Sequence, residues 1–193
     1  MTLHSSSQLA LTRDIIVCLT EESHGDEAAD ALAYPLSLVG MAGAHLTVQS
    51  AARRLTIVAG RAWGTSRILL RIENRRLRSL AQALAKRSVS DAASTGVTCT
   101  AEAPILAYPD LIARLTARAR LADLTILDAE ARGADLDCDL IDETFFRSGR
   151  LVIVVPSGWN DFRAHQDIIA WDGSAQTVRG ANNALPFLRA ATA

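Results

Sequence analysis

The sequence has few aromatic residues, few cysteines and no long apolar run, and each shortage excludes a class of protein. Aromatic residues make up 5% of the 193 residues, so an aliphatic core of helices on a parallel sheet is favoured over an aromatic-rich β-sandwich. The three cysteines are far apart and form no CxxC pair, which argues against a disulfide framework or a zinc site and fits a reducing compartment. No apolar run approaches the ~20 residues that cross a bilayer, and the Ser-rich start is unlike an export signal. We therefore expect a cytoplasmic protein without membrane contact.

Motifs of catalytic and metal sites are also missing. The sequence contains no GxGxxG, GxxxxGK or GxSxG, so a dinucleotide site, a P-loop and a nucleophile elbow have no support. The histidines are scattered, with no pair at helical ligand spacing. The acidic stretch 128–143 lacks the spacing of an EF-hand, which favours a solvated loop over a cation site. We expect no catalytic residue and no metal ligand, and hence no enzyme.

Short, β-branched apolar runs alternate with segments of helical periodicity. The expected strands are 14–19, 44–49, 97–101, 123–127 and 151–155, and the expected helices reach residue 41 and cover 67–93, 108–121 and 136–147. The stretch 51–66 fits no element. This alternation predicts βαβ units with right-handed crossovers, and therefore a doubly wound α/β fold with a mostly parallel sheet.

The last part of the chain adds one more pair of elements. Residues 157–166 are expected to be a linker, 167–171 (DIIAW) a strand and 174–191 a helix. One strand and one helix cannot bury their apolar faces alone, so they must dock on the first domain or on another chain. The expected division is a flexible tail (1–12), an α/β domain (13–156), a linker (157–166) and a partial second domain (167–193).

Several runs in these elements resemble the universal stress protein family. They are RDIIVCLT, AGAHLTVQS, LADLTIL and FFRSGRLVIVVPSG, and DIIAWDGSAQTVRGANNALPFLRAA resembles the start of the second domain in the tandem bacterial form of that family. Here that second domain would be truncated after its first strand and helix. The resemblance implies a flavodoxin-like, Rossmann-like sheet of order 3-2-1-4-5, followed here by the extra strand–helix unit. It also implies dimerisation through the fifth strand and, in some members, ATP binding.

The ATP site of the family implies a glycine pattern after the fourth strand: Gly, two residues, Gly, nine residues, then Gly with Ser or Thr. Backbone amides approach phosphates only where side chains are missing. In this sequence Gly133 stands alone, Gly149 does not complete the spacing, and the carboxylates of 128–143 would repel phosphate. We expect a degenerate nucleotide site without a cofactor, ATP being the alternative ligand. Asp172, Gly173 and Ser174 match the turn after the family's first strand and are the candidate cofactor-binding residues.

Basic residues are concentrated between positions 53 and 87. Ten of the twenty basic residues lie there, opposed only by Glu73. Four of them share one helical face at steps of four, four and three and are the candidate anion-binding residues: Arg67, Arg71, Arg75 and Arg78. Like charges at this spacing destabilise a helix mildly, and the acidic loop, an anionic partner or RNA are the candidates that could compensate them. No interleaved aromatic residue offers stacking for single strands, which favours a solvated or internally paired face over nucleic-acid binding.

Three functions follow from these features. The apolar fifth strand, Leu151–Val155, is an edge that invites pairing, so we expect a homodimer through this strand and the C-terminal unit. Trp159 and Trp171 are expected in the core or at an interface. The primary hypothesis is a non-catalytic stress-response or regulatory module that acts by homodimerisation or by binding a protein partner. The alternative is an ATP-binding switch or weak nucleotide hydrolase, with a site completed by a partner chain. The third hypothesis is an anion- or RNA-binding module that uses the four arginines.

Overall fold

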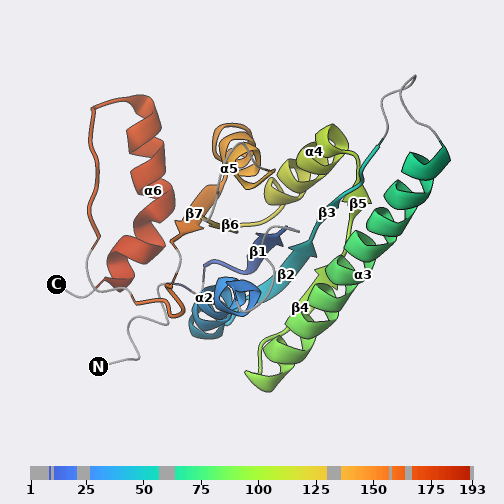
Figure 1. Ribbon diagram of the computed structural model, residues 1–193. Coiled ribbons are helices and arrows are strands. Elements are labelled where there is room, and N and C mark those ends of the chain that lie inside the picture. The colour runs from blue at the N-terminus through green and yellow to red at the C-terminus, as the bar shows by residue number, and fades with distance from the viewer. Residues whose placement is uncertain are drawn as a thin grey trace.

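A five-stranded parallel sheet forms the centre of the molecule (Figure 1). The computed structural model describes residues 9, 11–20, 27–56, 64–129, 136–156, 158–163 and 167–191. The strands are β1 (Asp14–Leu19), β2 (His45–Ser50), β4 (Cys99–Glu102), β6 (Leu124–Asp128) and β7 (Leu151–Val155). Their order is β4-β2-β1-β6-β7, and every neighbouring pair is parallel. In chain order this is 3-2-1-4-5, which confirms the predicted doubly wound, flavodoxin-like α/β fold.

Helices cover both faces of the sheet. They are α2 (Glu27–Ala42), α3 (Gly64–Ser94), α4 (Tyr108–Ala119), α5 (Leu136–Arg147) and α6 (Ala175–Ala190). Alternate residues of β1 show the two layers: Ile15 and Val17 share a cluster with Leu38 of α2, whereas Ile16 shares another with Leu111 of α4. The central strand is therefore buried on both faces, which explains why it reads as one continuous apolar run.

A second, smaller sheet occupies part of the stretch that the sequence left unassigned. It pairs β3 (Ala52–Arg53) with β5 (Ile105–Leu106) in parallel. The helix α3 packs on it through a cluster that contains Ala52, Leu77 and Ala81. The side chain of Asn74 in α3 accepts a hydrogen bond from the Leu55 amide (2.8 Å) and donates one to the Leu55 carbonyl (2.9 Å). Strands of two residues are too short for a period of two to be recognised in the sequence.

The predicted strand at 167–171 is wrong. This segment pairs with no strand in the described part of the chain, and Ile168 is 98% exposed. An apolar run becomes a strand only when a sheet edge satisfies its backbone groups, and within the described residues this segment pairs with neither edge of the sheet. The helix expected at 174–191 is present as α6, so only the helical half of the unit has regular structure.

Residues 158–163, in the expected linker, are fixed on α2. The ring of Phe162 lies edge-on between Tyr34 of α2, at 5.9 Å, and Phe187 of α6, at 6.0 Å. The Ser37 hydroxyl donates to Asp161 Oδ1 (2.5 Å) and accepts from the Phe162 amide (3.2 Å). Phe162 is only 9% exposed, so this contact connects α6 to the first domain. Residues 157 and 164–166 of the expected linker lie outside the described residues.

Both ends of the chain add to the same core cluster. Ala190 at the end of α6 is buried there and Phe187 packs against it. Leu9, in the expected tail, is fully buried in this cluster, and residues 1–8 lie outside the described part of the chain. The C-terminal helix is therefore docked on the first domain, one of the two arrangements that the sequence required.

Candidate functional site

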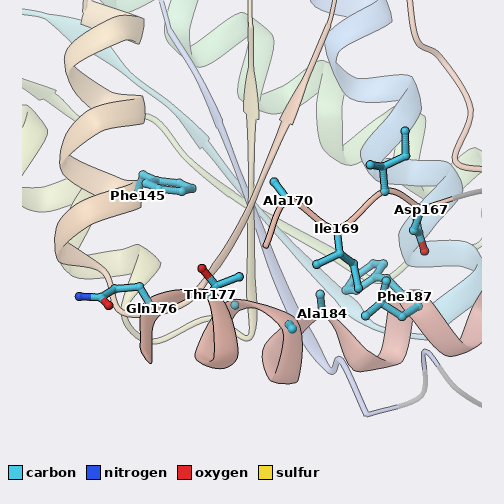
Figure 2. A pocket seen from close by; sticks show the side chains of 12 residues that line it. Phe145, Asp167, Ile169, Ala170, Gln176, Thr177, Ala184 and Phe187 are labelled. Carbon is cyan, nitrogen blue, oxygen red and sulfur yellow. The ribbon is translucent and has the colours of Figure 1, made fainter. Parts of the chain in front are cut away.

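An apolar groove of about 510 Å³ lies along α6. Figure 2 shows side chains from three elements around it: Phe145 from α5, Ile169 and Ala170 from the segment 167–170, and Phe187 from α6. The complete lining is Phe145, Asp167, Ile168, Ile169, Ala170, Gln176, Thr177, Gly180, Ala181, Ala184, Phe187 and Leu188. Small residues of α6 contribute to this lining, and they let another chain approach closely. The groove suits an apolar segment better than a charged ligand, because Asp167 is its only charged residue.

Large apolar side chains around this groove are exposed. Ile168 is almost fully exposed, and Trp171 and Phe146 are 61% and 77% exposed. Phe145, also exposed, lies edge-to-face with Phe146, with ring centroids 5.3 Å apart. Contiguous apolar surface of this kind marks interaction sites in soluble proteins. The sequence analysis did not single out Phe145 and Phe146, although two adjacent aromatic residues in a helix place at least one outside any single buried stripe.

The strand β7 is an edge of the sheet. Within the described residues its pairing partner is β6, and Val154 is 37% exposed. The edge strand and α6 are in contact, so the open strand edge and the apolar groove belong to one side of the molecule. Trp159, which follows this strand, is 59% exposed. The exposure of Trp159 and Trp171 excludes the core role for both, and the interface role remains a prediction.

The candidate cofactor-binding turn begins α6. The Asp172 carboxylate accepts hydrogen bonds from the Ser174 amide (2.8 Å) and from the Thr177 hydroxyl. Ser174 is the N-cap and accepts from the Thr177 amide at 3.2 Å, while Gly173 supplies the positive φ of 78° that the turn requires. The hydrogen bonds from Thr177 and Ser174 lower the pKa of Asp172 to about 2. These groups cap the helix, and a role for Asp172, Gly173 and Ser174 in binding a cofactor remains a prediction.

The carboxyl ends of the parallel strands form the second place where a ligand is expected in this fold. The strand order reverses between β1 and β6, and ligands of open α/β sheets bind at such a crossing. Thr20 follows β1, and Asp128 is the last residue of β6. The register of β1 and β6 brings the ends of the two strands side by side. Gly133 and residues 130–135, on which the glycine pattern was judged, lie outside the described residues.

Glu102, at the carboxyl end of β4, is held by two arginines of α4. Arg114 Nη2 lies 2.8 Å from Glu102 Oε2, and Arg118 binds Oε1. Burial alone would raise the pKa of Glu102, but its hydrogen bonds with Arg118 and Arg114 bring it below its usual value. This arrangement links the edge strand β4 to α4.

The four candidate anion-binding arginines are exposed on the first half of α3. Arg67, Arg71, Arg75 and Arg78 take part in no ion pair among the described residues. The neighbouring Glu73 instead pairs with Arg76, at 2.7 Å between Oε1 and Nη1. On α5, Glu143 pairs with Arg147 of the same helix. The acidic segment therefore does not compensate the arginine face in the part of the chain that the structure describes.

Two further findings concern metals and membranes. The described ranges contain no group of three or more His, Cys, Asp or Glu side chains arranged to hold a metal ion. No helix within them is both long and apolar enough to cross a membrane.

Comparison with known proteins gives structural similarity only. No family model and no curated protein matches the chain. Among solved structures, it is similar to a universal stress protein in complex with cAMP, at 12% identity over 75% of this chain and 97% of that one, with a TM-score of 0.46. It is also similar to a universal stress protein family member from Burkholderia pseudomallei (21% identity, 76% and 98% covered, TM-score 0.46). A universal stress protein from Archaeoglobus fulgidus follows at 16% identity, 74% and 97% covered, and a TM-score of 0.44.

These structures carry the family name that the sequence resemblance suggested, whereas the tandem form remains a prediction. The fold itself is defined by the strand order β4-β2-β1-β6-β7 and by the two helical layers.

Proposed function

We propose that this chain is a non-catalytic regulatory module that acts as a two-fold homodimer, joined through β7 and the segment 167–191. One observation supports this most directly: an open apolar strand edge and an exposed apolar segment lie on the same side of one molecule. An open edge invites pairing with another chain, and exposed aliphatic and aromatic side chains favour its burial. The assignment to stress response rests on the sequence resemblance alone.

A second copy of the chain is the partner that fits both features. The segment 167–171 is rich in residues that favour strands, yet it pairs with no strand in the described part of its own chain. In a two-fold arrangement the segment 167–171 of each protomer reaches the β7 edge of the other protomer. The dimer then contains two copies of this contact, and each buries one segment against one strand edge. A two-fold contact also closes the assembly, whereas an open contact of this kind would propagate into fibres.

Light scattering on purified variants tests the homodimer. The wild type should have twice the 20.7 kDa mass of the chain, and Val154→Lys and Ile168→Asp should each shift it towards the monomer mass. Val89→Lys on α3 is the matched control, because Val89 is 40% exposed and Val154 is 37% exposed. Circular dichroism checks that each variant is folded. A monomeric wild type would refute the dimer, and edge variants that stay dimeric would refute this interface.

A nucleotide-binding switch is the second candidate, with ATP as its ligand. The observation that favours it is the crossing between β1 and β6, where Asp128 ends β6 and Thr20 follows β1. Two of the similar structures are described with cAMP or dAMP, at similarly low identity. Asp128 places a carboxylate at this crossing, which opposes phosphate binding. Calorimetric titration of the purified protein with Mg-ATP distinguishes the two candidate functions. Saturable heat would support the nucleotide-binding switch. A pure dimer that gives no heat would support the non-catalytic regulatory module.

A further inference from the structure

The first half of α3 exposes three large aliphatic side chains. Ile68, Leu69 and Ile72 are 61%, 64% and 58% exposed, although aliphatic residues in a long helix usually face the core. At about 100° per residue, Ile68 and Ile72 lie roughly opposite Leu77 and Ala81, which pack on the small sheet. The helix therefore has two apolar faces, one of which is left in solvent.

Arginines surround this outer apolar face. Arg67, Arg71, Arg75 and Arg78 lie along one side of it, and Arg76 follows on the other. The single acidic residue of this half, Glu73, is paired with Arg76. The face therefore combines a strongly positive charge with aliphatic side chains that point away from the protein.

The opposite side of the helix is fixed. Asn74 makes two hydrogen bonds with the backbone of Leu55, and Leu77 and Ala81 are buried against β3 and β5. The helix thus cannot rotate to bury Ile68 and Ile72 without breaking these contacts. In Figure 1, α3 runs along the side of the molecule remote from α6.

We propose that this face of α3 binds the surface of an anionic lipid membrane, with the helix lying parallel to it. Arginine side chains bind the headgroup phosphates, and the aliphatic side chains enter the boundary between headgroups and acyl chains. The expectation of no membrane contact rests on the absence of a spanning segment and on the net charge of −1 for the whole chain, and neither describes the local charge of this face.

Charge and composition favour a membrane surface over a second copy of the chain or RNA as the partner of this face. A second copy of the same face would bring arginines against arginines. RNA bound as single strands would use aromatic side chains for stacking, and residues 64–94 contain none. RNA would also leave the aliphatic side chains in water. A membrane surface is the anionic partner that buries them.

Vesicle co-sedimentation of the full chain tests the proposal. The protein should bind vesicles of equal parts phosphatidylcholine and phosphatidylglycerol and should not bind pure phosphatidylcholine. Arg71→Gln with Arg75→Gln should lower the partition coefficient about twenty-five-fold, from about fivefold for each lost arginine. Ile68→Ser with Ile72→Ser should lower it at least about tenfold, because the aliphatic insertion is lost.

The control removes the same kinds of side chain outside α3. Arg13→Gln with Leu11→Ser removes one exposed arginine and one exposed aliphatic side chain before β1, and it should leave binding unchanged. Binding that ignores the Ile68/Ile72 change would show a purely ionic contact and overturn the proposal. Binding of poly(U) through the same arginines, without binding to vesicles, would also overturn the proposal. A control variant that loses as much vesicle binding as the test variants would overturn it as well.

Discussion

Two exposed apolar surfaces of this protein differ in their charge. On α3, Ile68 and Ile72 are flanked by arginines, whereas around the groove of α6 the aliphatic and aromatic side chains have few charged neighbours. A positive apolar face fits an anionic surface, because both its charges and its side chains gain from the contact. A face with few charges is stabilised mainly when its apolar area is removed from water, and contact with another protein surface achieves this. The exposure of apolar residues does not by itself identify the partner that covers them. The charges around these residues indicate which class of partner fits.

The two surfaces also differ in how they are held. The α3 face lies on a helix anchored to the small sheet by Asn74. The C-terminal surface lies on a unit connected to the first domain through Phe162 and the end of α6. Disrupting either anchor should affect one surface and spare the other.

The largest expected effect is that of Phe162→Ala. Removing a buried ring between Tyr34 and Phe187 should cost about 3 kcal/mol of the free energy of unfolding, measured by urea denaturation. Trp159→Ala, at an exposed position three residues earlier, should change it by less than about 0.5 kcal/mol in the monomer. Equal effects of the two changes would mean that Phe162 does not anchor the C-terminal unit.

A rise in salt should separate the two surfaces. Vesicle binding through the arginines should weaken at least about tenfold between low and high ionic strength, because exposed charges are screened. The dimer should keep its mass or tighten, since burial of apolar surface is not weakened by screening. Co-sedimentation and light scattering over the same salt series measure both. A dimer that dissociates as vesicle binding is lost would remove the distinction between the surfaces.

Much of the fold was predictable from the sequence because its signals are local. The strands at Asp14–Leu19 and Leu151–Val155 and the helix at Leu136–Arg147 match their predicted bounds, since apolar runs and turn residues delimit them. The pair β3 and β5 was missed because each strand has two residues. The segment 167–171 was assigned to a strand from its composition, whereas a strand depends on a partner edge that composition does not reveal.

The candidate site was less predictable. The four arginines were found on one helical face, but the exposure of Ile68 and Ile72 beside them depends on which side of α3 packs on the small sheet. The residues of the Asp172 turn were found from a motif, and their hydrogen bonds with Thr177 became evident only in the structure. The proposed function rests on the edge strand β7, which the sequence predicts, and on the exposed rings of Phe145 and Phe146, which it does not.

The smallest expected effect concerns pH. The pKa of Asp172 is lowered from 3.8 to about 2, so its charged form stabilises the folded α6 cap. This contribution is complete above pH 3.8 and is lost as pH falls from there through about 2. Hydrogen exchange in the first turn of α6 should therefore accelerate across this range. Asp172→Asn should abolish that dependence, and Asp110→Asn, in the first turn of α4, should preserve it.

Amide hydrogen exchange along β7 at increasing protein concentration tests the homodimer most directly. The outward amides of Leu151–Val155 have no partner strand in the single chain among the described residues, so they should exchange quickly when the protein is dilute. They should become protected as the dimer forms, together with the amides of 167–171. A dimer whose β7 amides exchange as quickly as those of the dilute monomer would contradict it.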